Sequence, residues 1–177
     1  QSDGLVVFEH DAERLEEMEA EMQLVARLAA GGEVEGLYLE MQPIMSLRQP
    51  NGALNFEVLL RMRDAAGRPV PTPRLITAAE HSGRMSHIDR WVLTQTLQWL
   101  QAEHGKLAHT QFVCVNLSGA SLNDERFLDD AFDLLQQHAD VASLLCLEIT
   151  ESVALHDLDN TRRFIQQWYQ DKLNREA

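Results

Sequence analysis

The sequence predicts an α/β fold in which short strands alternate with longer helices. From residue 36 onward, apolar runs with strand character are separated by segments whose apolar residues recur at helical spacing. Two of these runs, Phe112–Leu117 and Leu144–Ile149, are almost continuously apolar. Such runs are typical of strands that are covered on both faces or closed into a barrel. The connections between strands and helices are short, which favours a parallel sheet.

The first 35 residues have a different pattern. Residues 5–8 predict a short strand, and residues 12–30 predict a helix that stops at Gly31 and Gly32. The larger apolar residues of this helix follow a 3-4-3-4 spacing, at Leu15, Met18, Met22, Val25 and Ala29. This stripe has two interpretations: the helix packs on its own domain, or it is a linker helix that pairs with a copy of itself.

The next segment predicts a hairpin and two helices. Strands Leu37–Gln42 and Leu54–Met62 are joined through a turn at residues 50–52, and a polar loop follows at Asp64–Pro71. Thr72 is the expected N-cap of the next helix, with Pro73 at its first position and Gly83 after its end.

Ser86 is the expected cap of a further helix that ends near Gly105, with Asp89 three residues on as in a capping box. The rest of the chain continues the alternation with strand Phe112–Leu117, helix Glu125–Gln137, strand Leu144–Ile149 and helix Asp157–Tyr169.

Composition excludes several function classes. The net charge is −13 and no basic stripe is present, which argues against a nucleic-acid polymer as partner. No apolar run approaches the roughly 20 residues of a membrane span, and the start lacks the basic segment of a signal peptide. Cys114 and Cys146 lie in apolar runs and are expected to be buried small hydrophobes in a reducing compartment, so we expect a cytoplasmic location.

Three predicted strands each carry one oxygen-bearing side chain in or just after an apolar run. These residues are Glu57, Asn116 and Glu148. The carboxyl ends of parallel strands meet at one edge of a sheet, where ligands bind. Carboxylate and amide oxygens suit Mg²⁺ or Mn²⁺, and a bound cation would offset the cost of a carboxylate in an apolar strand. The alternative is that these groups cap helices or pair with lysine.

Four segments in order resemble the successive signatures of the EAL domain family, which hydrolyses the bacterial second messenger cyclic di-GMP. The segments are Gln42-Pro43-Ile44, Glu57-Val58-Leu59-Leu60-Arg61, Asn116-Leu117-Ser118 and Glu148-Ile149-Thr150-Glu151-Ser152. The resemblance runs from about Leu37 to about Gln167. The triplet that names the family reads Glu-Val-Leu here, with valine in place of alanine.

The resemblance implies a role for each matching residue. Glu57, Asn116 and Glu148 match positions that bind two catalytic divalent metals, Mg²⁺ or Mn²⁺. Glu57 and Glu151 match catalytic positions, with Glu151 steadying a loop near the metals. Gln42, Arg61 and Asp89 match positions that contact cyclic di-GMP, with the arginine on a phosphate and the aspartate on a guanine.

Simpler roles remain open for several of these residues. Gln42 could cap its strand, Arg61 could pair with Asp64 or Glu80, Asn116 could form an Asx-turn, and Glu151 could be a surface carboxylate at a helix start.

The resemblance also implies a TIM-like barrel of the EAL type, incomplete here after about four strands and preceded by a linker helix. The expected domains are 1–8 as the end of a preceding domain, for which a GGDEF-type domain is the candidate, 9–35 as the linker helix, and 36–177 as the N-terminal part of an EAL-like domain. The family's later metal carboxylates do not follow.

We therefore expect this chain alone to be inactive, within a longer phosphodiesterase that forms the linear dinucleotide. The alternative is a non-catalytic cyclic di-GMP sensor or interaction module. Half a barrel leaves an open sheet edge, so a homodimer through the barrel or the linker helix is expected.

Overall fold

The computed structural model describes residues 3–49, 52–150, 153–154 and 158–176, and of residues 3–10 and 175–176 only the helical backbone. The described chain divides into two compact units. The α1–α2 unit comprises residues 1–37 and 61–84, and the sheet unit comprises residues 38–60 and 85–177. Strand β2 (Asn55–Arg63) contributes residues to both units.

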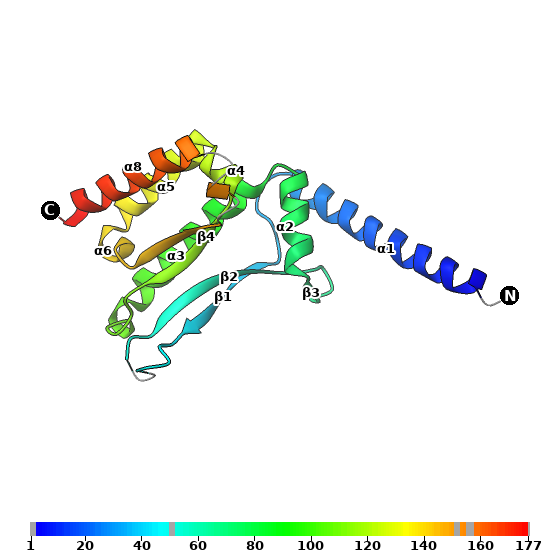
Figure 1. Cartoon of the computed structure of the whole chain (residues 1–177), viewed down its shortest axis with the longest axis horizontal. Helices are drawn as coiled ribbons and strands as arrows, with labels where there is room; N and C mark the ends of the chain where they lie inside the picture. The colour runs from blue at the N-terminus through cyan, green and yellow to red at the C-terminus, as the bar shows by residue number, and fades with distance from the viewer. Residues whose placement is uncertain (1–2, 50–51, 151–152, 155–157, 177) are drawn as a thin grey trace. The chain divides into compact units, whose positions relative to one another are not determined.

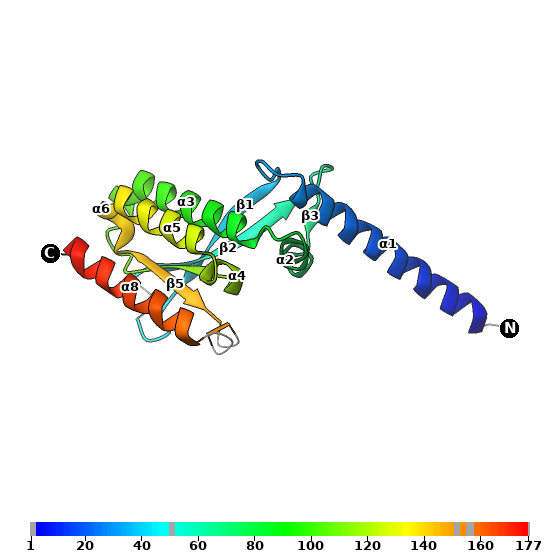
Figure 2. The same ribbon diagram turned by 90° about the horizontal axis from the view of Figure 1, so that it is seen from above.

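The α1–α2 unit is built on a long helix packed against a short one. Helix α1 (Asp3–Ala29) contacts α2 (Thr72–His81), and α2 lies across the C-terminal part of α1 in Figures 1 and 2. The buried side chains of this unit include Leu24 and Leu28 of α1 and Leu75 and Ala78 of α2. The end of β2 pairs antiparallel with β3 (Pro69–Val70).

Two local predictions in this unit are wrong. The strand predicted at residues 5–8 is helical, because α1 begins at Asp3. A run of four apolar residues fits either period, and extending an existing helix avoids the cost of a new nucleus. Thr72 is not the N-cap of α2, since Pro71 occupies that position without a side-chain bond. The Thr72 hydroxyl instead accepts a hydrogen bond from Arg61 Nη1 at 3.0 Å.

The sheet unit contains the predicted alternation of strands and helices. Its strands β1 (Leu37–Ile44), β2, β4 (Val113–Leu117) and β5 (Leu145–Ile149) lie in the order β1-β2-β4-β5. The pairs β2–β4 and β4–β5 are parallel. This arrangement confirms the α/β class, whereas closure into a barrel stays a prediction.

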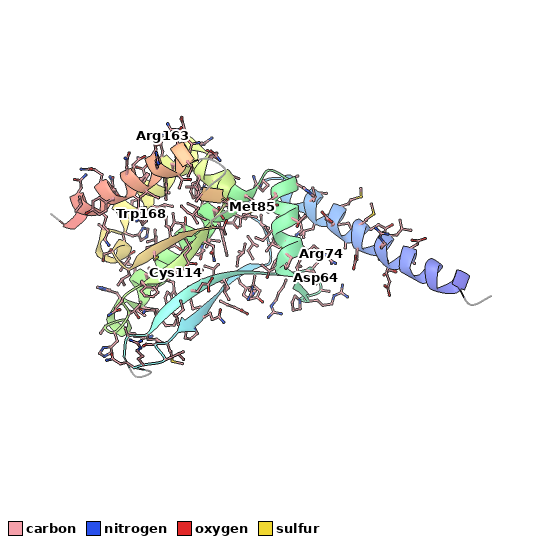
Figure 3. The ribbon with its side chains drawn as sticks, in the orientation of Figure 1. Asp64, Arg74, Met85, Cys114, Arg163 and Trp168 are labelled. Carbon is pink, nitrogen blue, oxygen red and sulfur yellow. The ribbon has the colours of Figure 1, made fainter. Side chains whose placement is uncertain are left out.

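The helices of the sheet unit cover the strands. Helix α3 (Met85–Glu103) packs against β4 and against α5 (Glu125–Gln137), and α3 and α5 run side by side in Figure 2. The other elements described in this unit are η1 (His104–Lys106), α4 (Gly119–Leu122), α6 (Ala139–Ala142) and α8 (Leu158–Glu176). Trp168 of α8, labelled in Figure 3, lies 6.1 Å from the Phe164 ring and 6.3 Å from the Phe132 ring of α5.

The sequence predicted some helix ends of the sheet unit correctly and others wrongly. Helix α5 has the predicted bounds, because the Asp124 side chain accepts from Phe127 N at 3.1 Å. The predicted cap at Ser86 is wrong, since α3 begins at Met85 and the Ser86 side chain bonds with Asp124. Helix α8 continues to Glu176, beyond the predicted end at Tyr169.

Among the residues described, no helix combines the length and the apolar content that crossing a bilayer requires.

Gly36 lets its own backbone lie close to the backbone of Arg63. Its φ is +86°, and a Cβ built there would lie 2.2 Å from the Arg63 carbonyl oxygen. We expect Gly36→Ala to lower the free energy of unfolding by about 2–4 kcal/mol, measured by urea denaturation. Gly67 has a φ of +78° with no atom within 4 Å, so Gly67→Ala should cost only about 1 kcal/mol. Equal losses in the two variants would contradict the close approach.

Candidate functional site

The register of three parallel strands places five polar or thiol side chains on one face of the sheet. Glu57 pairs with Cys114 across β2 and β4, and Cys114 pairs with Cys146 across β4 and β5. Asn116 pairs with Glu148. Paired residues of parallel strands, and residues two apart on one strand, share a face. Glu57, Cys114, Asn116, Cys146 and Glu148 therefore form one cluster, which we call the acid–thiol face.

The three predicted metal-binding residues thus lie together. Asn116 Nδ2 donates a hydrogen bond to Glu57 Oε1 at 3.2 Å, so Asn116 contacts another strand rather than forming only a local turn. Asn116 and Glu148 are exposed, and Glu57 is half-buried. The structure therefore corrects one premise, because Glu57 does not carry the full cost of burial within the described chain.

The two cysteines of this face have different environments. Cys114 is buried and Cys146 is exposed, so the prediction of buried cysteines is confirmed for the first and wrong for the second. Burial raises the pKa of the Cys114 thiol to about 12, and hydrogen bonds and charge from Cys146 and Glu148 add to the rise. The Cys114 side chain therefore contacts both Cys146 and Glu148. Figure 3 labels Cys114 on β4.

Asp89 holds the turn that follows β4. Its side chain is 7% exposed, and Oδ2 accepts hydrogen bonds from Ser118 N at 3.0 Å, Ser118 Oγ at 2.6 Å and Ser121 Oγ at 2.6 Å. Burial raises the pKa of Asp89, and the bonds from the two serines oppose that rise. This network replaces the predicted capping box, and it fixes the chain two residues after Asn116.

Ser118 takes part in a second local interaction. It is the N-cap of α4, and its hydroxyl accepts from Ser121 N at 3.2 Å. Asp89 of α3 and the start of α4 are thus joined through the hydroxyl groups of Ser118 and Ser121. In this structure Asp89 acts as an internal anchor, and its contact with a guanine stays a prediction.

The donors of the acid–thiol face fit a divalent cation in part. Two carboxylates and one amide oxygen are hard ligands of the kind that Mg²⁺ and Mn²⁺ prefer. The bond from Asn116 Nδ2 to Glu57 leaves the amide oxygen as the atom that a cation would take. In the described residues, no group of three or more His, Cys, Asp or Glu side chains could hold a metal ion. The three-residue set therefore supplies only part of a coordination shell.

The other predicted site residues do not belong to the acid–thiol face. Gln42 lies on β1 and is exposed. Arg61 belongs to the α1–α2 unit, where it bonds with Thr72. The predicted alternative partner Asp64 pairs with Arg68 at 3.1 Å. Glu151 lies outside the described residues.

Sequence reasoning missed that the two cysteines share a face with the predicted ligands. A signal was present, because Cys114 and Asn116 are two apart and so are Cys146 and Glu148. The period of a strand is two residues, so that spacing places both pairs on the ligand face.

Comparison with known proteins identifies relatives of this chain. A family model described as the EAL domain matches residues 23–172. The chain is 29% identical over 150 residues to the cyclic di-GMP phosphodiesterase PdeF of Escherichia coli, covering 85% of this chain and 20% of PdeF. It is 32% identical over 142 residues to the cyclic di-GMP phosphodiesterase PdeB of Shewanella oneidensis, covering 80% of this chain and 16% of PdeB.

Solved structures show the same fold. The crystal structure of the FimX EAL domain of Pseudomonas aeruginosa bound to cyclic di-GMP matches with a TM-score of 0.65 and 27% identity, over 82% of this chain and 56% of that domain. The phosphodiesterase PaMucR in complex with cyclic di-GMP matches with a TM-score of 0.65 and 28% identity, over 77% of this chain and 56% of that one. The chain thus spans about a fifth of the curated relatives named above and just over half of these solved chains.

The two thiols should differ in reactivity. At pH 8, about one part in 10⁴ of a thiol with a pKa near 12 is ionised. We expect iodoacetamide to modify Cys146 and to leave Cys114 unmodified in the folded chain, as measured by mass spectrometry of peptides. In the control variant Cys146→Ser, no thiol should react until denaturant is added. Fast modification of Cys114 in the folded protein would contradict its described environment.

Asp89 should make stability depend on pH. Because the folded-state pKa of Asp89 lies above its unfolded value near 3.8, ionisation of this group destabilises the native state. The unfolding free energy of the native chain, relative to that of Asp89→Asn, should therefore fall as pH rises from 3.8 through the folded pKa. Urea denaturation of both proteins between pH 4 and pH 8 measures this difference. A difference that stays constant or grows with pH would contradict the raised pKa.

Proposed function

Because the chain belongs to the EAL domain family, we propose that it forms part of a domain that binds cyclic di-GMP and hydrolyses it with the help of divalent cations. The observation that carries this proposal is the acid–thiol face, where Glu57, Asn116 and Glu148 lie on adjacent parallel strands. Its relatives include proteins named as cyclic di-GMP phosphodiesterases and an EAL domain crystallised with cyclic di-GMP.

Each residue of the face has a defined task in this proposal. The carboxylates of Glu57 and Glu148 and the amide oxygen of Asn116 would hold a Mg²⁺ or Mn²⁺ ion. Such an ion supplies Lewis acidity to the phosphodiester and a more acidic water. Asn116 also orients Glu57 through their hydrogen bond, so that the carboxylate need not reorganise when a cation arrives.

The residues that would contact the nucleotide rest on the resemblance alone. Arg61 suits a phosphate, because its planar guanidinium can donate two parallel hydrogen bonds. Gln42 is exposed on β1 and offers both a donor and an acceptor. Glu151 would steady a loop near the cations.

The domain assignment is part of the same proposal. We assign residues 36–177 to the N-terminal part of an EAL-like TIM barrel, and the helical residues within 9–35 to a linker that follows a GGDEF-type domain. The parallel register of β2, β4 and β5 supports the barrel assignment, because barrel strands of this type are parallel. The family match begins at residue 23, inside the last two turns of α1, and it includes all of residues 36–172.

A second candidate function is a cyclic di-GMP sensor that does not cleave its ligand. The observation that favours it is the small donor set, since the described part of the face offers two carboxylates and one amide. Nucleotide binding through Gln42 and Arg61 would not require a complete metal shell.

Mn²⁺ binding tests the donor set directly. We expect the 177-residue chain to bind Mn²⁺ in calorimetry, and we expect Glu57→Gln to weaken that binding by about 10-fold or more, because it removes one of two carboxylates. The control Asp129→Asn removes the same charge from an exposed position of α5 and should leave binding unchanged. Equal affinities in the two variants would remove Glu57 from the site.

Turnover distinguishes the two candidate functions. With only two carboxylates in the described cluster, the 177-residue chain should show negligible hydrolysis of cyclic di-GMP in the presence of Mn²⁺, measured by chromatography of the linear product. Nucleotide binding that requires Mn²⁺ would support the phosphodiesterase proposal, and binding that is independent of Mn²⁺ would support the sensor. Metal-dependent turnover by this chain would contradict its predicted inactivity.

A further inference from the structure

Helix α1 carries an exposed apolar stripe. Leu15 and Met18 are each 60% exposed and Met22 is 68% exposed, although all three are large apolar side chains. In Figures 1 and 2, no other described element of the α1–α2 unit lies beside the N-terminal turns of α1. A solvent-exposed row of this kind on one helix is typical of an interaction surface.

The stripe is not the face that α1 uses within its own unit. Leu24 is 7% exposed and Leu28 is fully buried. At 100° per residue, the direction of Leu24 and Leu28 lies about 130° around the helix axis from that of the stripe. The helix therefore has two apolar faces, one that packs within the unit and one that lacks a partner in the described chain.

The stripe has the spacing of a two-stranded coiled coil. Leu15 and Met22 fall at position a of a heptad, and Met18 and Val25 fall at position d. This pattern holds the apolar row on one side of a pair of supercoiled helices. From residue 15 to residue 29 the stripe is about 21 Å long.

The charges beside the stripe select a partner and an orientation. Arg14 occupies position g and Glu19 occupies position e of the next heptad, and both are exposed. In a parallel pair, position g of one helix faces the following position e of the other. Two copies of α1 in parallel register would therefore form two equivalent Arg14–Glu19 ion pairs.

The same charges argue against a bilayer as the partner. The other faces of the helix carry Glu13, Glu16 and Glu17, and all three are exposed. A helix that lies on a membrane surface is usually rich in Lys and Arg on its polar face. The anionic headgroups would repel this helix.

We propose that α1 pairs with α1 of a second copy of this chain in a parallel, in-register coiled coil along Leu15, Met18, Met22 and Val25. The Leu24–Leu28 face stays packed on α2, so each copy keeps its own fold when the helices pair. About two heptads give a weak dimer, with a dissociation constant on the order of micromolar. This proposal does not depend on cyclic di-GMP binding or hydrolysis.

Disulfide trapping tests the register. Met18 at position d would meet Met18 of the second copy only in a parallel in-register pair, because antiparallel helices oppose a with d. In a Cys146→Ser background, which removes the exposed native thiol, Met18→Cys should form a covalent dimer under mild oxidation. The matched control Glu13→Cys lies five residues before Met18 at position f, is also exposed to solvent and should stay monomeric. Equal trapping of the two variants would overturn the proposal.

A charge exchange tests the partner and does not depend on oxidation. Arg14→Glu should raise the dimer dissociation constant about fivefold in analytical ultracentrifugation, because two ion pairs become two repulsions. The double variant Arg14→Glu with Glu19→Arg should restore the native value. Circular dichroism of each variant controls for loss of the helix. A native chain that is monomeric up to 200 μM, or a double variant that is not restored, would overturn the proposal.

Discussion

The parallel register of β2, β4 and β5 is the constraint on which the candidate site depends. It pairs Glu57 with Cys114 and Asn116 with Glu148, so that polar side chains from three strands share one face. A slip of one residue in any strand would turn its polar group to the helix-covered side, where a carboxylate would need a partner. The apolar residues that alternate with these groups, Val113, Val115 and Leu117, are buried, and α3 packs against β4. Their burial favours this register over a slipped one.

A buried carboxylate fixes the end of the central strand. Asp89 accepts three hydrogen bonds from Ser118 and Ser121, and these donors offset the cost of placing the carboxyl group in the interior. The network connects Asp89, the fifth residue of α3, to the turn after β4. Because Asn116 lies two residues before Ser118, the same network restricts the position from which Asn116 reaches Glu57. A site made from strand ends needs such support, since loose side chains would not hold a cation at fixed distances.

Apolar side chains have different roles in the two units. In the sheet unit, apolar side chains are buried between strands and helices and hold the acid–thiol face in place. In the α1–α2 unit, one apolar face of α1 packs on α2 while a second face remains exposed over about two turns of heptad spacing. The first use stabilises a single copy, and the second leaves the surface on which we propose that two copies pair.

The sequence by itself determined the α/β class, the order of most elements and the three residues Glu57, Asn116 and Glu148, because apolar periodicity and a polar group in an apolar run are local signals. It also predicted the bounds of α5, whose cap Asp124 is adjacent in sequence. It could not assign the first eight residues, where four apolar side chains fit a strand or a helix equally well, nor the partners of Thr72, Ser86 and Asp89. Those partners are distant in sequence, at Arg61, Asp124 and Ser118. Only the tertiary structure decided that Cys146 is exposed beside the predicted ligands and that α1 has two apolar faces, because exposure depends on which elements pack together and not on the order of residues along the chain.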